Sequence, residues 1–169
     1  MSEIKLMLDI QRNLSANLHH TRRGGYQPLI NHYTAVHNGF KRITADDGLC
    51  SPLWEAAAFL HDAVEDGILK PDDKRISPEL REILMILTPM PNESPQAHFL
   101  RQMESEHPQI AAIVYANCMH NSVYTEMEKY FTEDVEKDPW DVARARYLKR
   151  ASIALARYAA LAFKETAVA

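Results

Sequence analysis

The chain has 169 residues, the length of one domain, since a domain usually contains about 100–200 residues. Hydrophobic residues make up 46% and charged residues 25%, which is ordinary for a globular protein and argues against disorder. Lys and Arg number 19 against 23 Asp and Glu, giving a formal net charge of −4. This charge argues against a nucleic-acid polymer as the partner, because binding to many phosphates needs a basic surface. A small anion can still bind where a few basic residues gather.

The sequence predicts no targeting or membrane segment. It contains no run of about 18 apolar residues, and its first residues lack the pattern of a secretory signal. The two cysteines, Cys50 and Cys118, are far apart and have no CxxC spacing, which is typical of reduced thiols in a cytosolic protein. We therefore expect a cytoplasmic protein with no membrane association, and the sequence leaves its oligomeric state open.

Helix start signals recur along the chain. At four places a serine or aspartate that can cap a helix precedes a proline, which fits the first helical turn because its missing N–H would be unpaired there. With the apolar spacing, these signals predict helices over residues 2–19, 29–44, 51–67, 77–88, 95–105, 108–131 and 139–164. No stretch alternates convincingly like a strand. The chain is therefore predicted to be a single all-α domain, a helical bundle over residues 1–169.

Four ionisable residues crowd the end of the predicted helix over residues 51–67, which is otherwise almost entirely apolar. Residues four apart share a helix face, so His61 is expected to lie over Glu65. Asp62 is likewise expected to lie over Asp66. Acidic residues at a helix C-terminus are disfavoured by the helix dipole, and like charges repel. A divalent cation is the simplest compensator, and a solvent-exposed helix end is the alternative.

Two further helices carry polar residues among apolar ones. His32 lies in the second predicted helix, where a satisfied core histidine or a surface one is the simpler explanation. Asn117 and Asn121 lie four residues apart in an apolar stretch, with His120 beside them. Three helices that each bring such groups together have the geometry of a metal site in a helical bundle. Histidine and carboxylate ligands suit Mn, Fe, Zn, Co or Ni better than Ca.

In their order along the chain, His32, the pair His61-Asp62 and the polar group on a later helix resemble the HD superfamily of metal-dependent phosphohydrolases. The segment over residues 59–67 is most similar to the (p)ppGpp hydrolases, the alarmone hydrolases that occur as domains of larger enzymes and as small stand-alone proteins. Their signature is an apolar run, His-Asp, two residues and Glu-Asp.

Two other segments agree with this resemblance, which covers about residues 20–125. Residues 22–32 are similar to a basic, glycine- and proline-containing stretch that leads to the family's first histidine. Residues 116–121 are similar to its Ala-Asp-x-x-His-Asn segment, but Asn117 stands where the family has a metal-binding aspartate. An amide oxygen is neutral and binds such cations less strongly than a carboxylate does. We therefore expect that the metal is bound more weakly, that water takes the place of Asn117 as a ligand, or that no metal binds.

The resemblance implies a role for each candidate residue. The expected metal is Mn, with Fe, Zn, Co or Ni as alternatives, and it is expected to bind four ligands: His32, His61, Asp62 and Asn117. Two catalytic acids are expected to orient a water molecule and take its proton: Glu65 and Asp66. Substrate contacts are expected from Arg22, Arg23 and Asn121, with Lys70, Lys74, Arg75 and Arg101 as further basic candidates for binding pyrophosphate.

These roles imply an enzyme that removes the 3′-pyrophosphate of (p)ppGpp or cleaves a related phosphorylated nucleotide. One alternative is a general nucleotidase or nucleoside-triphosphate hydrolase of the same superfamily. Another is a degenerate HD domain that binds a nucleotide or a protein without turnover. The arginines at positions 144, 150 and 157 are expected to form a solvated face, with phosphate binding as the alternative, and His98 is expected on the surface.

Overall fold

The computed structural model describes residues 2–21, 27–128 and 140–166, without the side chains of 124–128, 140, 165 and 166. The described residues form helices α1 (Glu3–Ala16), α2 (Leu29–Ile43), α3 (Pro52–Leu60), α4 (Pro78–Leu87), α5 (Pro95–Met103), α6 (Pro108–Glu128) and α7 (Trp140–Thr166). Within these ranges there is no strand, only an isolated bridge between Thr21 and Pro28. The prediction of an all-α bundle is confirmed.

Serine caps begin several helices, as predicted. The side chains of Ser77 and Ser94 accept hydrogen bonds from backbone amides three residues further on, and a proline follows each serine. Ser51 has the extended backbone of a cap and precedes Pro52, but its side chain makes no capping bond. The predicted start at Asp138-Pro139 lies outside the described residues.

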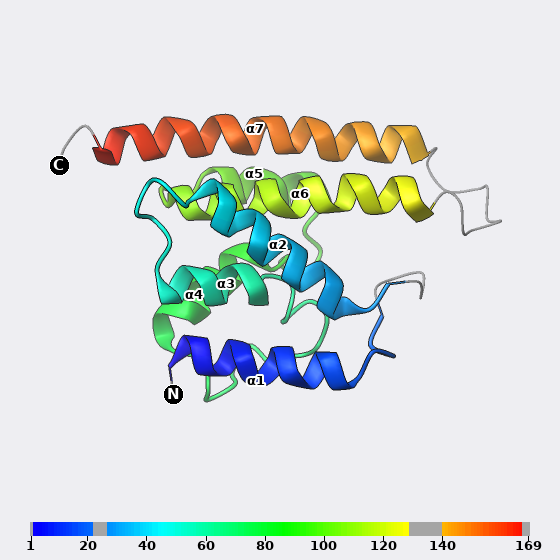
Figure 1. Cartoon of the computed structure of the whole chain (residues 1–169). Coiled ribbons are helices and arrows are strands. Elements are labelled where there is room, and N and C mark those ends of the chain that lie inside the picture. The colour runs from blue at the N-terminus through cyan, green and yellow to red at the C-terminus, as the bar shows by residue number, and fades with distance from the viewer. Residues whose placement is uncertain (1, 22–26, 129–139, 167–169) are drawn as a thin grey trace.

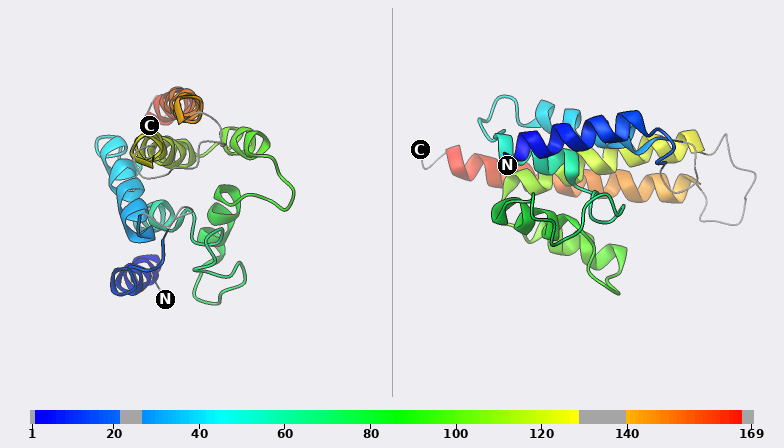
Figure 2. Two further views of the ribbon diagram at one scale, coloured as in Figure 1. Left: turned by 90° about the vertical axis from the view of Figure 1, so that its right-hand side faces the viewer. Right: turned by 90° about the horizontal axis from the view of Figure 1, so that it is seen from below.

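Helix α3 is buried between three other helices. Figure 1 shows α7 beside α6 at one side of the molecule and α1 at the other, with α2 and α3 between them, and the end-on view in Figure 2 agrees. Helix α3 packs against α1, α2 and α4, and residues 56–60 are completely or almost completely buried. The apolar composition of this helix therefore predicted its central position correctly. No helix among the described residues is long and apolar enough to cross a membrane.

The end of α3 differs from the prediction. The helix ends at Leu60 rather than near residue 67, and hydrogen-bonded turns follow. The amide of Ala63 bonds to the carbonyl of Leu60, three residues back, and the chain reverses at Gly67 with a φ of 71°. A regular helix end would place this acidic segment on the negative pole of the helix dipole, which is unfavourable. The predicted helix end near residue 67 is therefore wrong, although the amide of Asp66 still bonds to the carbonyl of Asp62, four residues back.

Candidate metal centre

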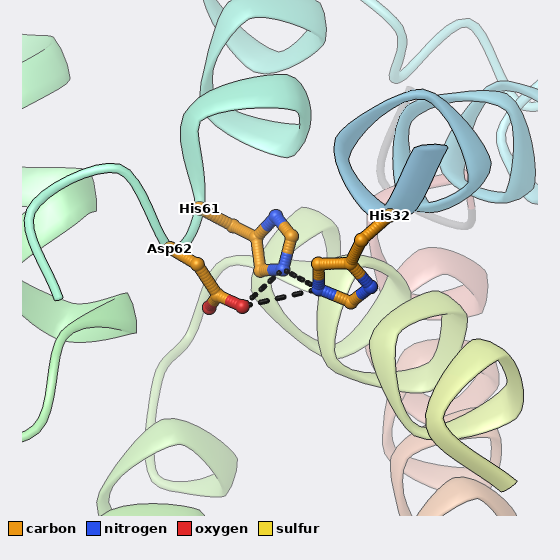
Figure 3. A group of neighbouring side chains, drawn as sticks. All are labelled: His32, His61 and Asp62. Atoms are coloured by element: carbon orange, nitrogen blue, oxygen red, sulfur yellow. Dashed lines mark hydrogen bonds and ion pairs between the residues drawn. The ribbon is translucent and has the colours of Figure 1, made fainter. Parts of the chain in front are cut away.

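Three side chains meet in the core where α2 passes the end of α3. His32 comes from α2, and His61 and Asp62 follow directly on α3. The Nε2 atoms of the two histidines are 3.1 Å apart, and each is 3.1 Å from Oδ2 of Asp62 (Figure 3). Both imidazoles are buried, and 19% of the Asp62 side chain is exposed. These are three of the four predicted metal ligands, and they form the one group of His, Cys, Asp and Glu side chains with metal-binding spacing among the described residues.

The backbone sets the orientation of His61. Its Nδ1 atom lies 3.1 Å from the carbonyl oxygen of Ala58, which can only accept a hydrogen bond. Nδ1 therefore carries a proton, and Nε2 is the ring atom that faces His32 and Asp62 and that could bind a metal ion. A histidine held through its other nitrogen is the usual arrangement of a metal ligand.

His32 is held through its far nitrogen by another histidine. Its Nδ1 atom lies 2.9 Å from Nδ1 of His120, on α6. With Nδ1 donating to His120, His32 presents the lone pair of Nε2 toward His61 and Asp62. With the opposite tautomer, Nε2–H of His32 is shared between these two acceptors. The first arrangement is the one that a bound cation selects, because it leaves three donor atoms without protons.

The spacing of these atoms suits a small divalent cation. Donors about 2.1 Å from one metal ion are about 3.0 Å apart in an octahedron and about 3.4 Å apart in a tetrahedron. The 3.1 Å edges lie within this range. Two imidazoles and a carboxylate are ligands that first-row transition metals such as Mn, Fe, Zn, Co or Ni prefer, so the identity of the metal stays a prediction.

Asp62 is negatively charged in this arrangement. Burial raises the pKa of its carboxyl, but the charge and hydrogen bonds of His61 and His32 outweigh burial and hold the pKa well below its usual range. The positive charge and the donors that the two histidines supply to this carboxylate are what a bound cation would supply in place of their protons.

A cavity of about 570 Å³ opens beside these ligands. Six of the residues predicted from the sequence line it: His61, Asp62, Glu65, Asp66, Asn117 and Asn121. Its size is in the range of small-molecule sites. The structure therefore brings the predicted ligands, acids and amides to one place, with His32 in the protein wall behind them.

Two contacts hold the polar residues of this cavity. Oδ2 of Asp66 accepts a 2.8 Å hydrogen bond from the hydroxyl of Tyr33, which is completely buried in α2. Oδ1 of Asn117 accepts a 2.7 Å bond from Nδ2 of Asn121 and keeps a second lone pair. Asp66 is thus hydrogen-bonded to α2, the helix that carries His32. The two amides on α6 orient each other.

Several cavity residues were not predicted as part of the site. Arg150 lines the cavity, and Nη2 of Arg157 donates to the carbonyl of Ser105, so the expectation of a solvated face is wrong for both. His98 also lines the cavity and is partly buried, so its predicted place on the surface is wrong. The sequence holds no local signal for these positions, because they depend on how distant helices pack.

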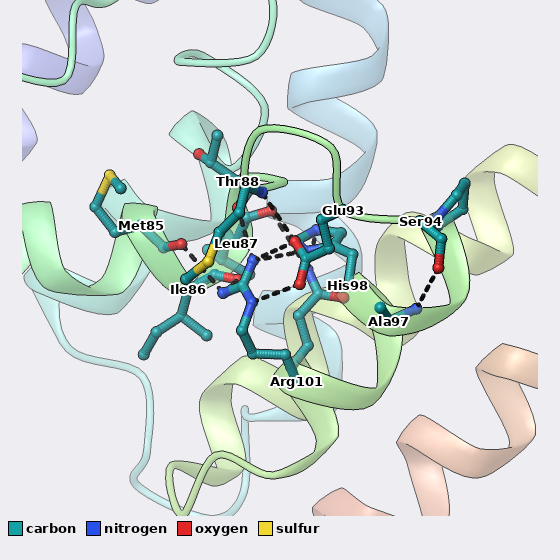
Figure 4. A network of polar contacts seen from close by, with 12 residues as sticks. Met85, Ile86, Leu87, Thr88, Glu93, Ser94, Ala97, His98 and Arg101 are labelled. Atoms are coloured by element: carbon teal, nitrogen blue, oxygen red, sulfur yellow. Dashed lines mark hydrogen bonds and ion pairs between the residues drawn. The ribbon is translucent and has the colours of Figure 1, made fainter.

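The described lysines and arginines that were predicted to bind substrate do not line the cavity. Arg101 donates to Glu93 and to the carbonyls of Ile86 and Thr88, so its guanidinium is occupied within the protein (Figure 4). Arg75 pairs with Asp73, and neither it nor the two lysines lines the cavity. Arg22 and Arg23 lie outside the described residues.

Comparisons with known proteins add nothing to this geometry. No protein-family model matches the chain, and neither the curated proteins nor the solved structures contain a match.

Proposed function

We propose that this chain is an HD-type, metal-dependent phosphohydrolase that acts on a phosphorylated nucleotide and releases the 3′-pyrophosphate of (p)ppGpp or a close analogue. The observation that carries the proposal is the triangle of His32, His61 and Asp62 with 3.1 Å edges beside a nucleotide-sized cavity. The order of these residues along the chain, with the Glu-Asp pair behind them, is what favours an alarmone hydrolase over other metalloproteins.

The chain's own residues divide the chemistry between them. His32, His61 and Asp62 hold the cation, and Asn117 is the fourth candidate ligand. The cation, when bound, lowers the pKa of a coordinated water and polarises a phosphoryl oxygen. Glu65 and Asp66 line the cavity beyond these ligands and take the proton of the attacking water. The oxygen of this water would bond to the phosphorus attached to the ribose 3′ oxygen, and the bond between that phosphorus and the 3′ oxygen would break. The 3′ oxygen would take up a proton to become a hydroxyl, and pyrophosphate would be released.

The contacts of the cavity residues agree with the roles proposed for them. Asp66 is held by Tyr33, which suits an acid that orients water, whereas Glu65 has an exposed side chain on the cavity wall. Asn121 donates to Asn117 and lies where the resemblance expects a ribose contact. Asn117 supplies a neutral oxygen in place of a carboxylate, so the proposal includes a weaker metal affinity than an aspartate would give.

Pyrophosphate release from ppGpp by the purified chain with added Mn²⁺ tests the proposal. We expect Asp62→Ala to abolish release and Glu65→Ala to slow it by roughly 10²–10⁴-fold, the usual contribution of a positioned acid–base group. Asp72→Ala, in an exposed loop, is the control and should keep wild-type activity. Release of phosphate or triphosphate from other nucleotides would indicate a general nucleotidase. No turnover of any nucleotide with metal bound would overturn the proposal and favour a binding domain.

A further inference from the structure

Arg150, on α7, lines the same cavity as the metal-binding residues. Its Nη2 atom donates a 3.0 Å hydrogen bond to the carbonyl of Pro95, and its guanidinium carbon lies 5.3 Å from the ring centroid of Phe99. A guanidinium over an aromatic face is held by a cation–π interaction. The side chain is therefore fixed against α5 and is not a mobile surface arginine.

The hydrogen-bonding capacity of Arg150 is only partly used. Its Nε atom is buried and has no hydrogen-bond partner, and no described carboxylate forms an ion pair with it. Arg101 differs, because it is paired with Glu93 and bonded to backbone carbonyls. A buried N–H without a partner costs free energy comparable to a lost hydrogen bond. The Nη1 atom forms no hydrogen bond to a described residue, and unlike Nε it is not among the buried atoms, so a ligand can accept from it.

Arg150 is the only lysine or arginine among the described residues that line the cavity. The other charged residues there are acids, and the guanidinium lies more than 4.0 Å from the carboxylates of Asp62, Glu65 and Asp66, since it forms no ion pair with them. The cavity thus presents a metal centre built from α2 and the segment after α3, and one separate cationic group from α7. A nucleotide with phosphate groups at two positions can contact both points at once.

We propose that Arg150 binds a second phosphate group of the substrate, separate from the one that is cleaved at the metal centre. This inference rests on the proposed function and narrows it to nucleotides that carry phosphates at two positions. The planar guanidinium suits this task, because it can donate two parallel hydrogen bonds to a phosphate. Arg150 is then a specificity-determining residue, and it takes no part in bond breaking.

Calorimetric titration with a pair of ligands tests this assignment. The protein is the Mn²⁺-loaded Glu65→Gln variant, which suppresses turnover, with Arg150 intact or changed to Met. The probes are ppGpp and guanosine 3′-diphosphate, which lacks the 5′ phosphates. We expect Arg150→Met to weaken ppGpp binding by roughly tenfold to hundredfold, since a charge-assisted hydrogen bond is lost. Binding of guanosine 3′-diphosphate should change by less than about threefold, the scatter of independent sites.

Two further variants keep the test sharp. Arg146→Met, an exposed position on the same helix, should bind both probes like the parent. Arg150→Lys keeps the charge without the planar fork and should recover part of the ppGpp affinity, which also guards against a folding defect in the methionine variant. An equal loss for both probes, no loss for either, or no binding of ppGpp to the parent overturns the inference. Absence of pyrophosphate release by the wild type overturns the proposed function alone, because the binding comparison does not depend on turnover.

Discussion

Two clusters of histidine and carboxylate each contribute residues to the wall of one cavity, and they differ in how their charges are balanced. In the cluster of Glu93, His98 and Arg101, the glutamate oxygens accept from Arg101 and from the amide of Met90, so each acceptor has a donor (Figure 4). In the cluster of His32, His61 and Asp62, three groups that can accept converge on one point (Figure 3). The first is complete within the protein and connects α4 to α5, whereas the second is the proposed cation site. Buried polarity alone therefore does not identify a site; the balance of donors and acceptors does.

Removing the arginine from the complete cluster should give the largest effect on stability. Arg101→Met leaves Glu93 without its main partner and frees the carbonyls of Ile86 and Thr88. We expect the free energy of unfolding to fall by about 2–3 kcal/mol, the cost of losing hydrogen bonds to a charged group, as measured by urea denaturation. Mn²⁺ affinity of the folded variant should stay within about twofold of wild type, since the two clusters share no partner. Loss of metal binding with an unchanged stability would reverse the roles assigned to the clusters.

Changing His120 should lower the Mn²⁺ affinity, which the Arg101 variant leaves unchanged. His120→Leu removes the acceptor at Nδ1 of His32, and we expect Mn²⁺ affinity to fall by roughly 10–100-fold, the usual cost of losing the partner of a metal ligand. His120→Asn is the matched control, because its side-chain oxygen takes the approximate position of Nδ1, and it should recover most of the affinity. Equal Mn²⁺ affinities for the leucine variant and the wild type would show that His120 does not orient His32.

Asn117 offers a gain rather than a loss. Asn117→Asp replaces a neutral oxygen by a charged one in the cavity that His61 and Asp62 line, and we expect Mn²⁺ affinity to rise by about tenfold. Asn121→Asp places the same charge one helical turn away on the partner amide and is the control, with a smaller gain. Calorimetry with Mn²⁺ measures both. An unchanged affinity in Asn117→Asp would remove this position from the ligand set.

Protonation of Glu93 at low pH should destabilise the protein by weakening its contacts with Arg101. The hydrogen bond from Arg101, and then that from Met90, lowers the pKa of Glu93 from 4.5 to about 2. A carboxyl with a lowered pKa contributes stability that is full above pH 4.5 and is lost as the pH falls toward 2. We expect the free energy of unfolding to fall as the pH is lowered through this window, and to fall less steeply in Arg101→Met than in the wild type. Parallel acid-denaturation curves for the two proteins would contradict the assignment.

The fold followed from local signals, and part of the site did not. Proline and serine mark the starts of α4 and α5, and the apolar run of α3 identified the central helix. The end of α3 was misjudged because periodicity does not register the cost of acidic groups at a helix C-terminus. His61 and Asp62 stood out as polar residues after an apolar run.

Other site residues had no such local contrast. Arg150 and His98 line the cavity because α5 and α7 approach it from outside, and nothing in their sequence neighbourhood distinguishes them from surface residues. The contact between His32 and His120 joins positions that are distant in the chain. The resemblance to a family predicted which residues belong to the ligand set. The contact with His120 that orients His32 could not be predicted from the sequence.

The central claim is that His32, His61 and Asp62 hold a divalent cation. Equilibrium dialysis against Mn²⁺ followed by elemental analysis tests it directly, with wild type, His61→Ala and the exposed control Asp72→Ala treated alike. We expect about one Mn per chain in the wild type and in the control, and almost none in His61→Ala, since two ligands rarely retain such an ion. A wild type that emerges free of Mn, or a His61→Ala variant that retains as much as the wild type, would contradict the claim.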